Sequence, residues 1–363
     1  MEAGIRRDVE MAKYKVAWLP GDGVGNDVME AAKIVLDSTS LDAEYIEGEV
    51  GWTCWEKYGD PLPPETIELL KETDTCLFGA ITSKPGVKGY KSPIVRARQL
   101  FQLYANVRPC KAYPGNPLNY RDGIDIIVFR ENTEGLYSGL DFHPPLIPEI
   151  LAIPGLEDAD PENSAVSIRH FTRNGCQRII RAAFEYARKH KRRAVTSITK
   201  ANVIRATCGM FLEEAKKIAE EYPEIEYWDA NIDAMTMWLI KNPEDYDILV
   251  TSNMFGDIIS DEAAQLVGGL GFAASGSMGA DYALFEPTHG SAPKYAGMYK
   301  VNPTAMLLST KMMLDYLGEM EMASHLENGI ARTIAEKRVR TYDMGGSNTS
   351  LEVAEEVVKN MGP

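Results

Sequence analysis

Strand-like apolar runs alternate with helix-like stretches along the first half of the chain, and this alternation constrains the fold more than any other feature. The run YKVAWLP (14–20) has the pattern of a buried strand, and a turn with three glycines leads from it into a helix-like stretch. TCLFGAIT and the β-branched run GIDIIVFR (123–130) repeat the strand pattern after further helix-like stretches. Alternating strands and helices pack as layers, so the sequence predicts an α/β fold.

Length and charge narrow the class of protein. A chain of 363 residues corresponds to one large domain or two ordinary ones. No apolar run reaches the roughly 18 residues of a membrane span, and the N-terminus lacks a signal-peptide pattern, so we expect a cytoplasmic protein. The net charge of −15 argues against a nucleic-acid binder, because phosphates are attracted by a basic surface. The five cysteines form no CxxC pair, which predicts reduced thiols.

The glycine loop after the first strand is similar to a dinucleotide-binding loop but does not match one. Gly21, Gly23 and Gly25 follow the strand, whereas the fingerprint G-x-G-x-x-G requires the third glycine one residue later. A tight turn between a strand and a helix accounts for all three glycines. We therefore predict such a turn rather than a Rossmann-type phosphate site.

Three arginines stand where a charged side chain is poorly placed unless it meets an anion. Arg98 and Arg108 are ten residues apart in SPIVRARQLFQLYANVRP, and Arg130 ends the strand IIVFR. If the first segment is helical at Arg98 and extended at Arg108, their guanidinium groups converge. Each group can bind a carboxylate through two hydrogen bonds, so the set suits a compact polycarboxylate. Scattered surface salt bridges are the alternative interpretation.

A tyrosine and a lysine are candidates for proton transfer. Tyr137 stands in the glycine-flanked segment ENTEGLYSG, where it is either a packed ring or an acid whose pKa would have to be lowered by nearby cations. Lys200 ends the strand-like run SITK, which is an unfavourable place for a core residue. Desolvation and neighbouring cations would lower the pKa of Lys200 and allow it to act as a base.

Two carboxylates four residues apart, Asp257 and Asp261, lie where a strand gives way to a helix in LVTSNMFGDIISDEAAQLVGG. Helix geometry places them on one face, with Cβ atoms about 5–6 Å apart. Asp233, expected inside an otherwise apolar helix in WDANIDAMTMWLI, adds a third oxygen donor, and such a set suits Mg²⁺ or Mn²⁺. With the three arginines and a divalent cation, the site would carry two surplus positive charges for a di- or tri-anion. Alternatively, Asp261 is only a helix-start acid favoured by the helix dipole.

These residues stand in motifs that resemble the metal-dependent β-decarboxylating dehydrogenases of isocitrate, homoisocitrate and 3-isopropylmalate. The resemblance covers nearly the whole chain and rests on the motifs LPGDGVG, RARQLFQLYANVRP, FRENTEGLYSG, TKANV, DAMTM, TSNMFGDIISDEAAQLVGGLG and FEPTHGSAPKYAG. It implies a two-domain isopropylmalate-dehydrogenase-like α/β fold that is not a Rossmann fold. Residues 1–106 and 263–363 would form a large cofactor-binding domain. Residues 107–262 would form a small domain, in which the stretch 140–163, with five prolines, would be a dimerisation arm.

The resemblance implies a role for each candidate residue. The substrate would be contacted by Ser92, Arg98, Arg108 and Arg130. The metal would be bound by Asp257, Asp261 and, from the partner subunit, Asp233. Lys200, also from the partner subunit, would take the hydroxyl proton, and Tyr137 would protonate the enol after CO₂ leaves. The hydride would pass to NAD(P).

The cofactor contacts implied by the resemblance are Thr82, Glu286, His289, Gly290, Lys294, Tyr295, Val301, Asn302 and Tyr342. We favour NADP and keep NAD as the alternative. NAD-using relatives tend to carry an aspartate after SAP, where this chain has Lys294 followed by Tyr295. A cation with neighbouring phenols suits a 2′-phosphate. The arginine that NADP enzymes add after the last tyrosine is absent, since DMGGS follows Tyr342.

The expected substrate is isocitrate or homoisocitrate, and 3-isopropylmalate is the alternative. Ile94 replaces the asparagine usual in isocitrate enzymes, and with Val95 it would suit an isopropyl group. Arg96 would either reach an extra carboxylate or face solvent.

The resemblance also bears on partners. We expect a homodimer with shared active sites, a small di- or tricarboxylate substrate, and neither nucleic-acid nor membrane partners. A regulatory subunit on the same fold is the non-enzyme alternative. Such a subunit should have lost Tyr137, Lys200 or an aspartate, and this chain keeps them all.

Overall fold

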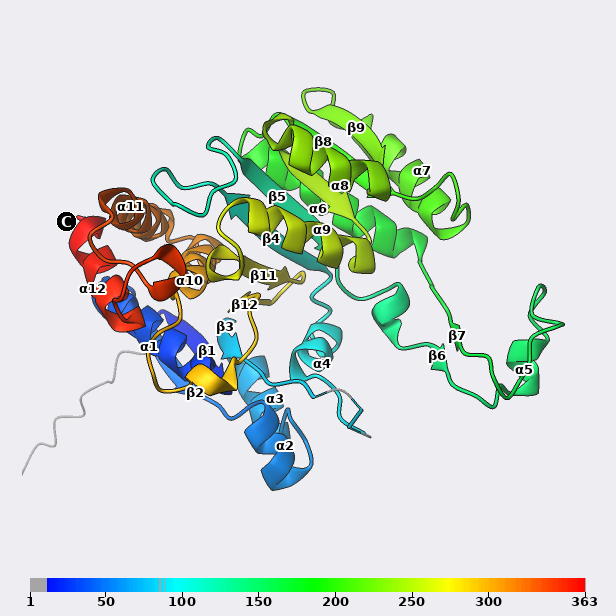
Figure 1. Ribbon diagram of the computed structural model, residues 1–363, viewed down its shortest axis with the longest axis horizontal. Coiled ribbons are helices and arrows are strands. Elements are labelled where there is room, and N and C mark those ends of the chain that lie inside the picture. The colour runs from blue at the N-terminus through cyan, green and yellow to red at the C-terminus, as the bar shows by residue number, and fades with distance from the viewer. Residues whose placement is uncertain (1–11, 85, 88, 363) are drawn as a thin grey trace, which may run out of the picture. The chain divides into compact units, whose positions relative to one another are not determined.

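The structure, a computed structural model, describes residues 12–84, 86–87 and 89–362. The chain divides into two compact units (Figure 1). The first contains the residues up to Ala97 together with those from Tyr282 onward, and the second is Arg98–Asp281. The sequence-based boundaries, after residues 106 and 262, fall inside the second unit. The cofactor-binding and dimerising roles assigned to the two predicted domains stay predictions.

The first unit contains a parallel sheet with the strand order β2-β1-β3-β12. Its strands are β1 (Tyr14–Gly21), β2 (Ala43–Glu47), β3 (Thr75–Ala80) and β12 (Ala283–Pro287). Its helices are α1 (Val24–Asp37), α2 (Trp52–Tyr58), α3 (Pro64–Glu72), α10 (Thr304–Tyr316), α11 (Met320–Glu336) and α12 (Ser350–Met361), and α4 (Pro93–Leu100) crosses the boundary between the units. Helices α1 and α10 pack against β3, every residue of which is buried, as in a parallel strand covered by helices.

The second unit contains a mixed sheet with the strand order β11-β4-β5-β10-β8-β9. Its strands are β4 (Ala105–Lys111), β5 (Asp125–Glu131), β8 (Ala194–Thr199), β9 (Glu226–Asn231), β10 (Ile248–Thr251) and β11 (Ala274–Met278). Its main helices are α6 (Arg173–Lys189), α7 (Thr207–Ala219), α8 (Ile232–Lys241) and α9 (Asn253–Leu266). The pairs β11–β4 and β4–β5 are antiparallel, and the other pairs are parallel.

Alternation along β5 assigns the helices of this unit to opposite faces of the sheet. Ile126 and Val128 belong to a core cluster that includes Met235 of α8 and Ile259 of α9. Phe129 instead contacts the ring of Tyr186 in α6, with the centroids 5.4 Å apart. Because successive side chains of a strand point to opposite faces, α8 and α9 cover one face of the sheet and α6 covers the other.

The proline-rich stretch 140–163 contains little regular structure. It includes β6 (Asp141–Phe142) and α5 (Pro148–Leu151), and β6 pairs antiparallel with β7 (Val166–Ser167). Figure 1 shows α5 near the end of a long segment that extends away from the sheet of its unit. Its use in dimerisation stays a prediction.

The cysteines and the hydropathy of the helices bear on two of the predictions made from the sequence. All five cysteines are free and buried, as expected of reduced thiols. In the part of the chain that the structure describes, no helix is both long enough and apolar enough to cross a membrane.

The three glycines after β1 form the predicted strand-to-helix turn. Gly21 and Gly23 adopt positive φ angles of 75° and 58°. Gly25 lies in the first turn of α1, where an added Cβ would be 2.2 Å from the carbonyl oxygen of Pro20 and 2.7 Å from the amide nitrogen of Ala80. Only glycine therefore allows α1 to begin directly against the ends of β1 and β3, so close packing explains the third glycine without a nucleotide.

We predict that Gly25→Ala lowers the free energy of unfolding by about 1–3 kcal/mol, because the new methyl group must push α1 away from the sheet. Urea unfolding followed by circular dichroism measures this change. An unchanged midpoint would show that the close approach of α1 to β1 and β3 is not required.

Candidate active site

The antiparallel pair β4–β5 places two predicted substrate arginines on the same face of the sheet. In the register of this pair, Arg108 lies opposite Val128, and Asn106 lies opposite Arg130. Cys110 and Val128 belong to the core cluster beneath α9, so alternation places Asn106, Arg108 and Arg130 on that same face. Residues 108 and 130 are thus diagonal neighbours on adjacent strands, and both face α9.

Helix α9 presents a polar stripe to these strands. It packs against β4 and β5. Its polar face combines glycine with side chains spaced three or four residues apart: Asn253, Gly256, Asp257, Ser260 and Asp261. The helical face predicted for the two aspartates is therefore observed. Arginines from distant strands face the aspartates, although the segment 249–269 contains no basic residue.

Arg130 is nearly enclosed, with 3% of its surface exposed. Its Nη1 forms an ion pair with Oδ1 of Asp257. Its Nε and Nη2 donate hydrogen bonds of 3.0 and 2.8 Å to Oδ1 of Asn253. The guanidinium is therefore fixed on two edges, by a neutral amide on one side and a carboxylate on the other.

Arg108 is also buried, with 8% of its surface exposed. Its Nε donates a hydrogen bond of 2.8 Å to Oδ1 of Asn106, and its Nη1 donates one of 2.7 Å to Oγ of Ser260. The same Nη1 lies 3.3 Å from Asp261 and 3.5 Å from Asp257. Two arginines and two aspartates thus form one cluster.

Electrostatic coupling links all three predicted arginines. Burial, followed by the positive charge of Arg108, lowers the pKa of Arg130 to about 10. Arg98 lowers this pKa further, and Asp257 opposes these effects. Arg130 remains cationic at neutral pH, and both Arg108 and Arg98 lie near enough to influence its charge.

Tyr137 joins the cluster through Asp257. Its hydroxyl donates a hydrogen bond of 2.9 Å to Oδ2 of Asp257, and its ring lies 5.4 Å from the guanidinium carbon of Arg130. The sequence suggested that cations would have to lower the pKa of this phenol. Instead, burial and then the charge of Asp257 raise the pKa of Tyr137. The phenol is therefore protonated at neutral pH, which is the form that a proton donor needs.

Lys200 and Asp233 form a pair of their own. Lys200 follows β8, Asp233 lies in the first turn of α8, and Nζ of the lysine is 2.5 Å from Oδ1 of the aspartate. This ion pair lowers the pKa of Asp233. Asp233 is at the start of its helix rather than inside it. Lys200 contacts a carboxylate, although its expected role as a base required neighbouring cations.

The predicted ligands of a divalent cation are the carboxylates of Asp233, Asp257 and Asp261. Among the described residues, no three histidine, cysteine, aspartate or glutamate side chains are grouped to hold a metal ion. Within one chain, Asp233 therefore does not join Asp257 and Asp261. The side chains of Asp257 and Asp261 are 34% and 62% exposed on one helical face. Two such carboxylates fit a hard divalent cation that takes its other oxygen ligands from elsewhere.

The residues predicted to bind the cofactor all lie in the first unit, as does Ser92. Thr82 follows β3, and its Oγ1 is 2.6 Å from Oγ of Ser291. Nδ1 of His289 lies 3.0 Å from the carbonyl oxygen of Gly290 and so must donate to it, which leaves Nε2 as an acceptor in the neutral ring. Burial lowers the pKa of His289. Within the described chain its buried Nε2 has no hydrogen-bond partner. As an acceptor, this atom suits a hydrogen-bond donor group on a ligand.

The residues predicted to discriminate NADP from NAD are also close together. The rings of Tyr295 and Tyr342 are 6.0 Å apart, and Nζ of Lys294 is 4.8 Å from the ring of Tyr295. Tyr342 is 53% exposed. Among the remaining predicted contacts, Glu286 is buried in β12, and Nδ2 of Asn302 donates to Asp343 at 3.0 Å. Val301 contributes its carbonyl oxygen to a hydrogen bond from Ser350.

The structure answers the question about Arg96 in α4. Its Nη1 donates hydrogen bonds of 2.7 and 2.9 Å to the carboxylate of Asp60 and one of 3.2 Å to the carbonyl oxygen of Leu62. Arg96 therefore binds a carboxylate of its own chain. Beside it, Ile94 is buried and Val95 is exposed, so only Val95 of the predicted apolar pair offers a surface.

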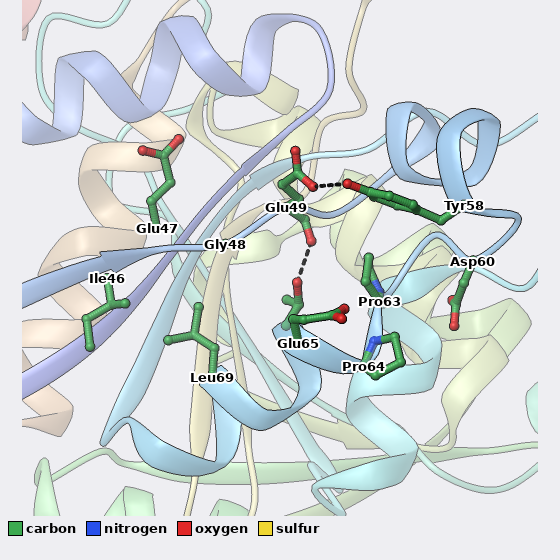
Figure 2. Close-up of a pocket in the computed structure, with 11 residues that line it drawn as sticks. Ile46, Glu47, Gly48, Glu49, Tyr58, Asp60, Pro63, Pro64, Glu65 and Leu69 are labelled. Carbon is green, nitrogen blue, oxygen red and sulfur yellow. Dashed lines mark hydrogen bonds between the residues drawn. The ribbon is translucent and has the colours of Figure 1, made fainter.

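Figure 2 shows a surface pocket in the first unit with a volume of about 870 Å³. Its lining includes four acidic residues, Glu47, Glu49, Asp60 and Glu65. The Tyr58 hydroxyl points to Glu49 and donates a hydrogen bond of 2.9 Å to it (Figure 2). No predicted site residue belongs to this lining. Its negative charge is the opposite of what a polycarboxylate needs, so the arginine cluster remains the candidate site.

Three polar residues of the cluster were not identified from the sequence: Asn106, Asn253 and Ser260. A signal for each was present. Asn253 and Ser260 stand four residues before and three residues after Asp257, and Asn106 stands two residues before Arg108. Helical and strand periodicity therefore places all three on the faces that carry the predicted site residues.

Comparisons with known proteins give a consistent result. Residues 15–360 match the family described as isocitrate/isopropylmalate dehydrogenase. The chain is 45% identical over 355 residues to a homoisocitrate dehydrogenase of Methanocaldococcus jannaschii, covering 95% of this chain and 96% of the relative. It is 42% identical over 351 residues to a 3-isopropylmalate dehydrogenase of Methanothermobacter thermautotrophicus, covering 97% and 99%.

A solved structure agrees with these matches. The crystal structure of isocitrate dehydrogenase from Methylococcus capsulatus superposes with a TM-score of 0.88 at 39% identity, covering 96% of this chain and 99% of that one. The predicted isopropylmalate-dehydrogenase-like fold is therefore confirmed. The matched relatives act on three different malates, so similarity alone does not identify the substrate.

We predict that Gly256→Ala destabilises the protein, although alanine is the better helix former. A Cβ at Gly256 would lie 2.6 Å from Cβ and Cγ of Arg130, so the arginine must move. Gly209, in helix α7, has no atom within 4 Å of such a Cβ, and Gly209→Ala should stabilise the protein by about 0.5–1 kcal/mol. Urea unfolding of both variants tests the contrast. Equal stabilisation would contradict the packing of Arg130 on α9.

Proposed function

Because the chain belongs to the isocitrate/isopropylmalate dehydrogenase family, we propose that it catalyses the NADP-dependent oxidative decarboxylation of isocitrate or homoisocitrate. As a member of this family it is a dehydrogenase that uses NAD(P), a divalent metal and a small carboxylate substrate. The observation that carries the proposal is the cluster of Arg108, Arg130, Asp257, Asp261 and Tyr137.

The arginines supply the anion-binding part of this site. Arg108 and Arg130 are buried, cationic and held by several hydrogen bonds, so they are pre-organised for substrate carboxylates. Arg98 adds a third positive charge close enough to affect Arg130. The arrangement supports a malate with two or three carboxylates, which the arginines would orient for reaction.

Asp257 and Asp261 would bind the metal, together with Asp233 from the partner subunit. The bound cation would supply Lewis acidity to the oxygen on the substrate carbon that is oxidised. In the described chain both carboxylates face Arg108, and Asp257 also faces Arg130. The arginines therefore lie beside the two carboxylates that would hold the metal.

Lys200 and Tyr137 would perform the proton transfers. Lys200 of the partner subunit would take the proton of the substrate hydroxyl while a hydride leaves the same carbon for the nicotinamide. Loss of CO₂ from the resulting keto acid leaves an enol. Tyr137 would return a proton to the carbon of this enol, and its phenol is protonated at neutral pH.

NADP is favoured over NAD because of the groups gathered around Tyr295. Lys294 supplies a positive charge, and Tyr295 and Tyr342 supply two phenols within a small region of the first unit. These groups suit the two negative charges of a 2′-phosphate.

One observation favours 3-isopropylmalate as a second candidate substrate. Arg96, which could have paired with an extra substrate carboxylate, binds Asp60 instead. Val95, beside it on α4, is 39% exposed and offers an apolar contact. Such a surface suits a hydrocarbon substituent on the malate, as in the relative from Methanothermobacter thermautotrophicus.

A second copy of the chain is the proposed partner. Met237 and Ile240 of α8 are 55% and 48% exposed, as are Trp228 of β9 at 59% and Ile258 of α9 at 52%. Exposed apolar side chains on neighbouring elements are typical of a protein interface. Asp233, Met237 and Ile240 are spaced along one face of α8, so a dimer formed there would include a predicted metal ligand.

We predict that the purified protein reduces NADP in the presence of isocitrate or homoisocitrate and Mg²⁺ or Mn²⁺, and that EDTA abolishes the reaction. Absorbance at the wavelength of the reduced cofactor, with each of three malates and with NAD and NADP, identifies the preferred pair. Activity with 3-isopropylmalate alone would replace the first substrate assignment with the second. No reaction under any condition would overturn the proposed function.

We predict that active sites are shared between subunits and that inactive variants can therefore complement each other. Tyr137→Phe and Lys200→Met should each lose about 10²-fold or more in kcat. In a mixed dimer one site would carry both changes and the other neither. Random reassociation should therefore restore about a quarter of the wild-type activity.

The control for this experiment is a mixture of Tyr137→Phe and Asp257→Asn. Tyr137 and Asp257 contact each other within one chain, so every site of this mixed dimer carries one of the changes. Its activity should not recover. Recovery in the control, or no recovery in the test mixture, would contradict the assignment of Lys200 to the partner subunit.

A further inference from the structure

Each of the two buried arginines, Arg108 and Arg130, donates hydrogen bonds to the side-chain oxygen of an asparagine. Oδ1 of Asn106 accepts from Nε of Arg108 at 2.8 Å. Oδ1 of Asn253 accepts from both Nε and Nη2 of Arg130, at 3.0 and 2.8 Å. The two asparagines come from different elements, β4 and α9, yet each presents an amide oxygen to a guanidinium. The same contact, an amide oxygen that accepts from a buried guanidinium, thus occurs twice in one site.

The amide of Asn106 is fixed by its other contacts. Its Nδ2 donates to the hydroxyls of Ser275 and Ser277 on β11, at 2.7 and 3.0 Å. Asn106 has no exposed surface. Because both Nδ2 protons point to the serines, Oδ1 can only face Arg108, and the orientation of the guanidinium follows from that of the amide.

Asn253 is fixed in a comparable way. It is 3% exposed, and its Nδ2 donates to the carbonyl oxygen of Glu134 at 3.2 Å. Its single amide oxygen accepts two of the hydrogen bonds donated by Arg130. Asn253 therefore ties Arg130 both to the start of α9 and to the loop that leads to Tyr137.

An acidic side chain at either position would bind the arginine more strongly than an amide does. It would also place a negative charge at the site where the substrate, itself an anion, must bind. In a buried environment that repulsion is poorly screened. An amide oxygen orients the guanidinium and adds no charge.

We propose that Asn106 and Asn253 are positioning residues that orient Arg108 and Arg130 for the carboxylates of the substrate while adding no negative charge to the site. This inference rests on the proposed function and extends it to residues that do not touch the substrate. It makes charge neutrality, in addition to shape, the property required at both positions.

Asn106→Asp separates charge from shape. The variant keeps the size of the side chain and its acceptor for Arg108, and the hydroxyls of Ser275 and Ser277 can turn to donate to the second carboxylate oxygen. We expect the KM for the substrate to rise about tenfold or more, with a smaller change in kcat and an unchanged KM for the cofactor. Asn106→Ala, which removes the acceptor and adds no charge, should raise the substrate KM less.

A merely structural role predicts the opposite order, because Asn106→Asp preserves contacts that Asn106→Ala loses. An Asn106→Asp enzyme with a substrate KM equal to or below that of Asn106→Ala would overturn the proposal. If either Asn106 variant does not fold, Asn253→Asp and Asn253→Ala are compared instead. Asn253→Asp also loses the hydrogen bond to the carbonyl oxygen of Glu134. Its substrate KM must therefore exceed that of Asn116→Asp, which loses a similar bond to Val267, as well as that of Asn253→Ala. Far-ultraviolet circular dichroism establishes folding before the kinetics are measured.

Asn116→Asp is the matched control. Asn116 is buried in the same unit, and its amide contacts the backbone of Leu118 and Val267 rather than an arginine. This variant should lower the melting temperature and leave the substrate KM unchanged. An increase in KM equal to that of Asn106→Asp would show that any buried charge has the same effect, which would also refute the proposal.

Failure of this inference can be distinguished from failure of the proposed function. Wild-type activity is measured first with isocitrate, homoisocitrate and 3-isopropylmalate. If the wild type reacts and Asn106→Asp binds the substrate equally well by isothermal titration calorimetry, only the inference fails. If the wild type neither reacts with nor binds any of the three, the proposed function fails and with it the basis of the inference.

Discussion

The burial of two guanidinium groups beside each other is the constraint on which the rest of the site depends. Arg108 and Arg130 stand on adjacent strands and repel each other, and both are almost enclosed. Removing such groups from water costs several kcal/mol per charge unless hydrogen bonds and opposite charges replace the water. Helix α9 supplies both kinds of partner from one face. The antiparallel pair β4–β5 makes this possible, because it brings the two arginines to the side of the sheet that α9 covers.

Local patterns in the sequence were sufficient to predict several strands and helices and some of the residues of the site. The run that became β3 and the β-branched run of β5 predicted strands, and the spacing of Asp257 and Asp261 predicted a shared helical face. These features depend on the backbone within a few residues, where periodicity is informative. They identified the carboxylates of the cluster but not the side chains that contact them.

Long-range pairing explains what the sequence could not provide. Burial, and then the charge of Asp257 from 120 positions away, raise the pKa of Tyr137. The expectation of a lowered pKa failed because the sequence showed neither the burial nor the neighbour. Arg96 binds Asp60, 36 positions away, and neither alternative considered for it included an internal partner. Asn106 was overlooked for a different reason. An asparagine in a strand carries no chemical signal until the arginine it contacts is known.

The charge balance of the cluster links its possible ligands to one another. The positive charges of Arg108 and Arg130 balance the negative charges of Asp257 and Asp261. Arg98 adds one further positive charge nearby. A substrate with two or three carboxylates would therefore overcompensate the site by itself. A divalent cation alone would bring positive charge close to buried arginines. Each ligand removes the electrostatic cost of the other, so their binding should be mutually favourable, and thermodynamic linkage makes the coupling equal in both directions. A neutral amide behind each arginine preserves this balance, which a buried carboxylate would shift by a full charge.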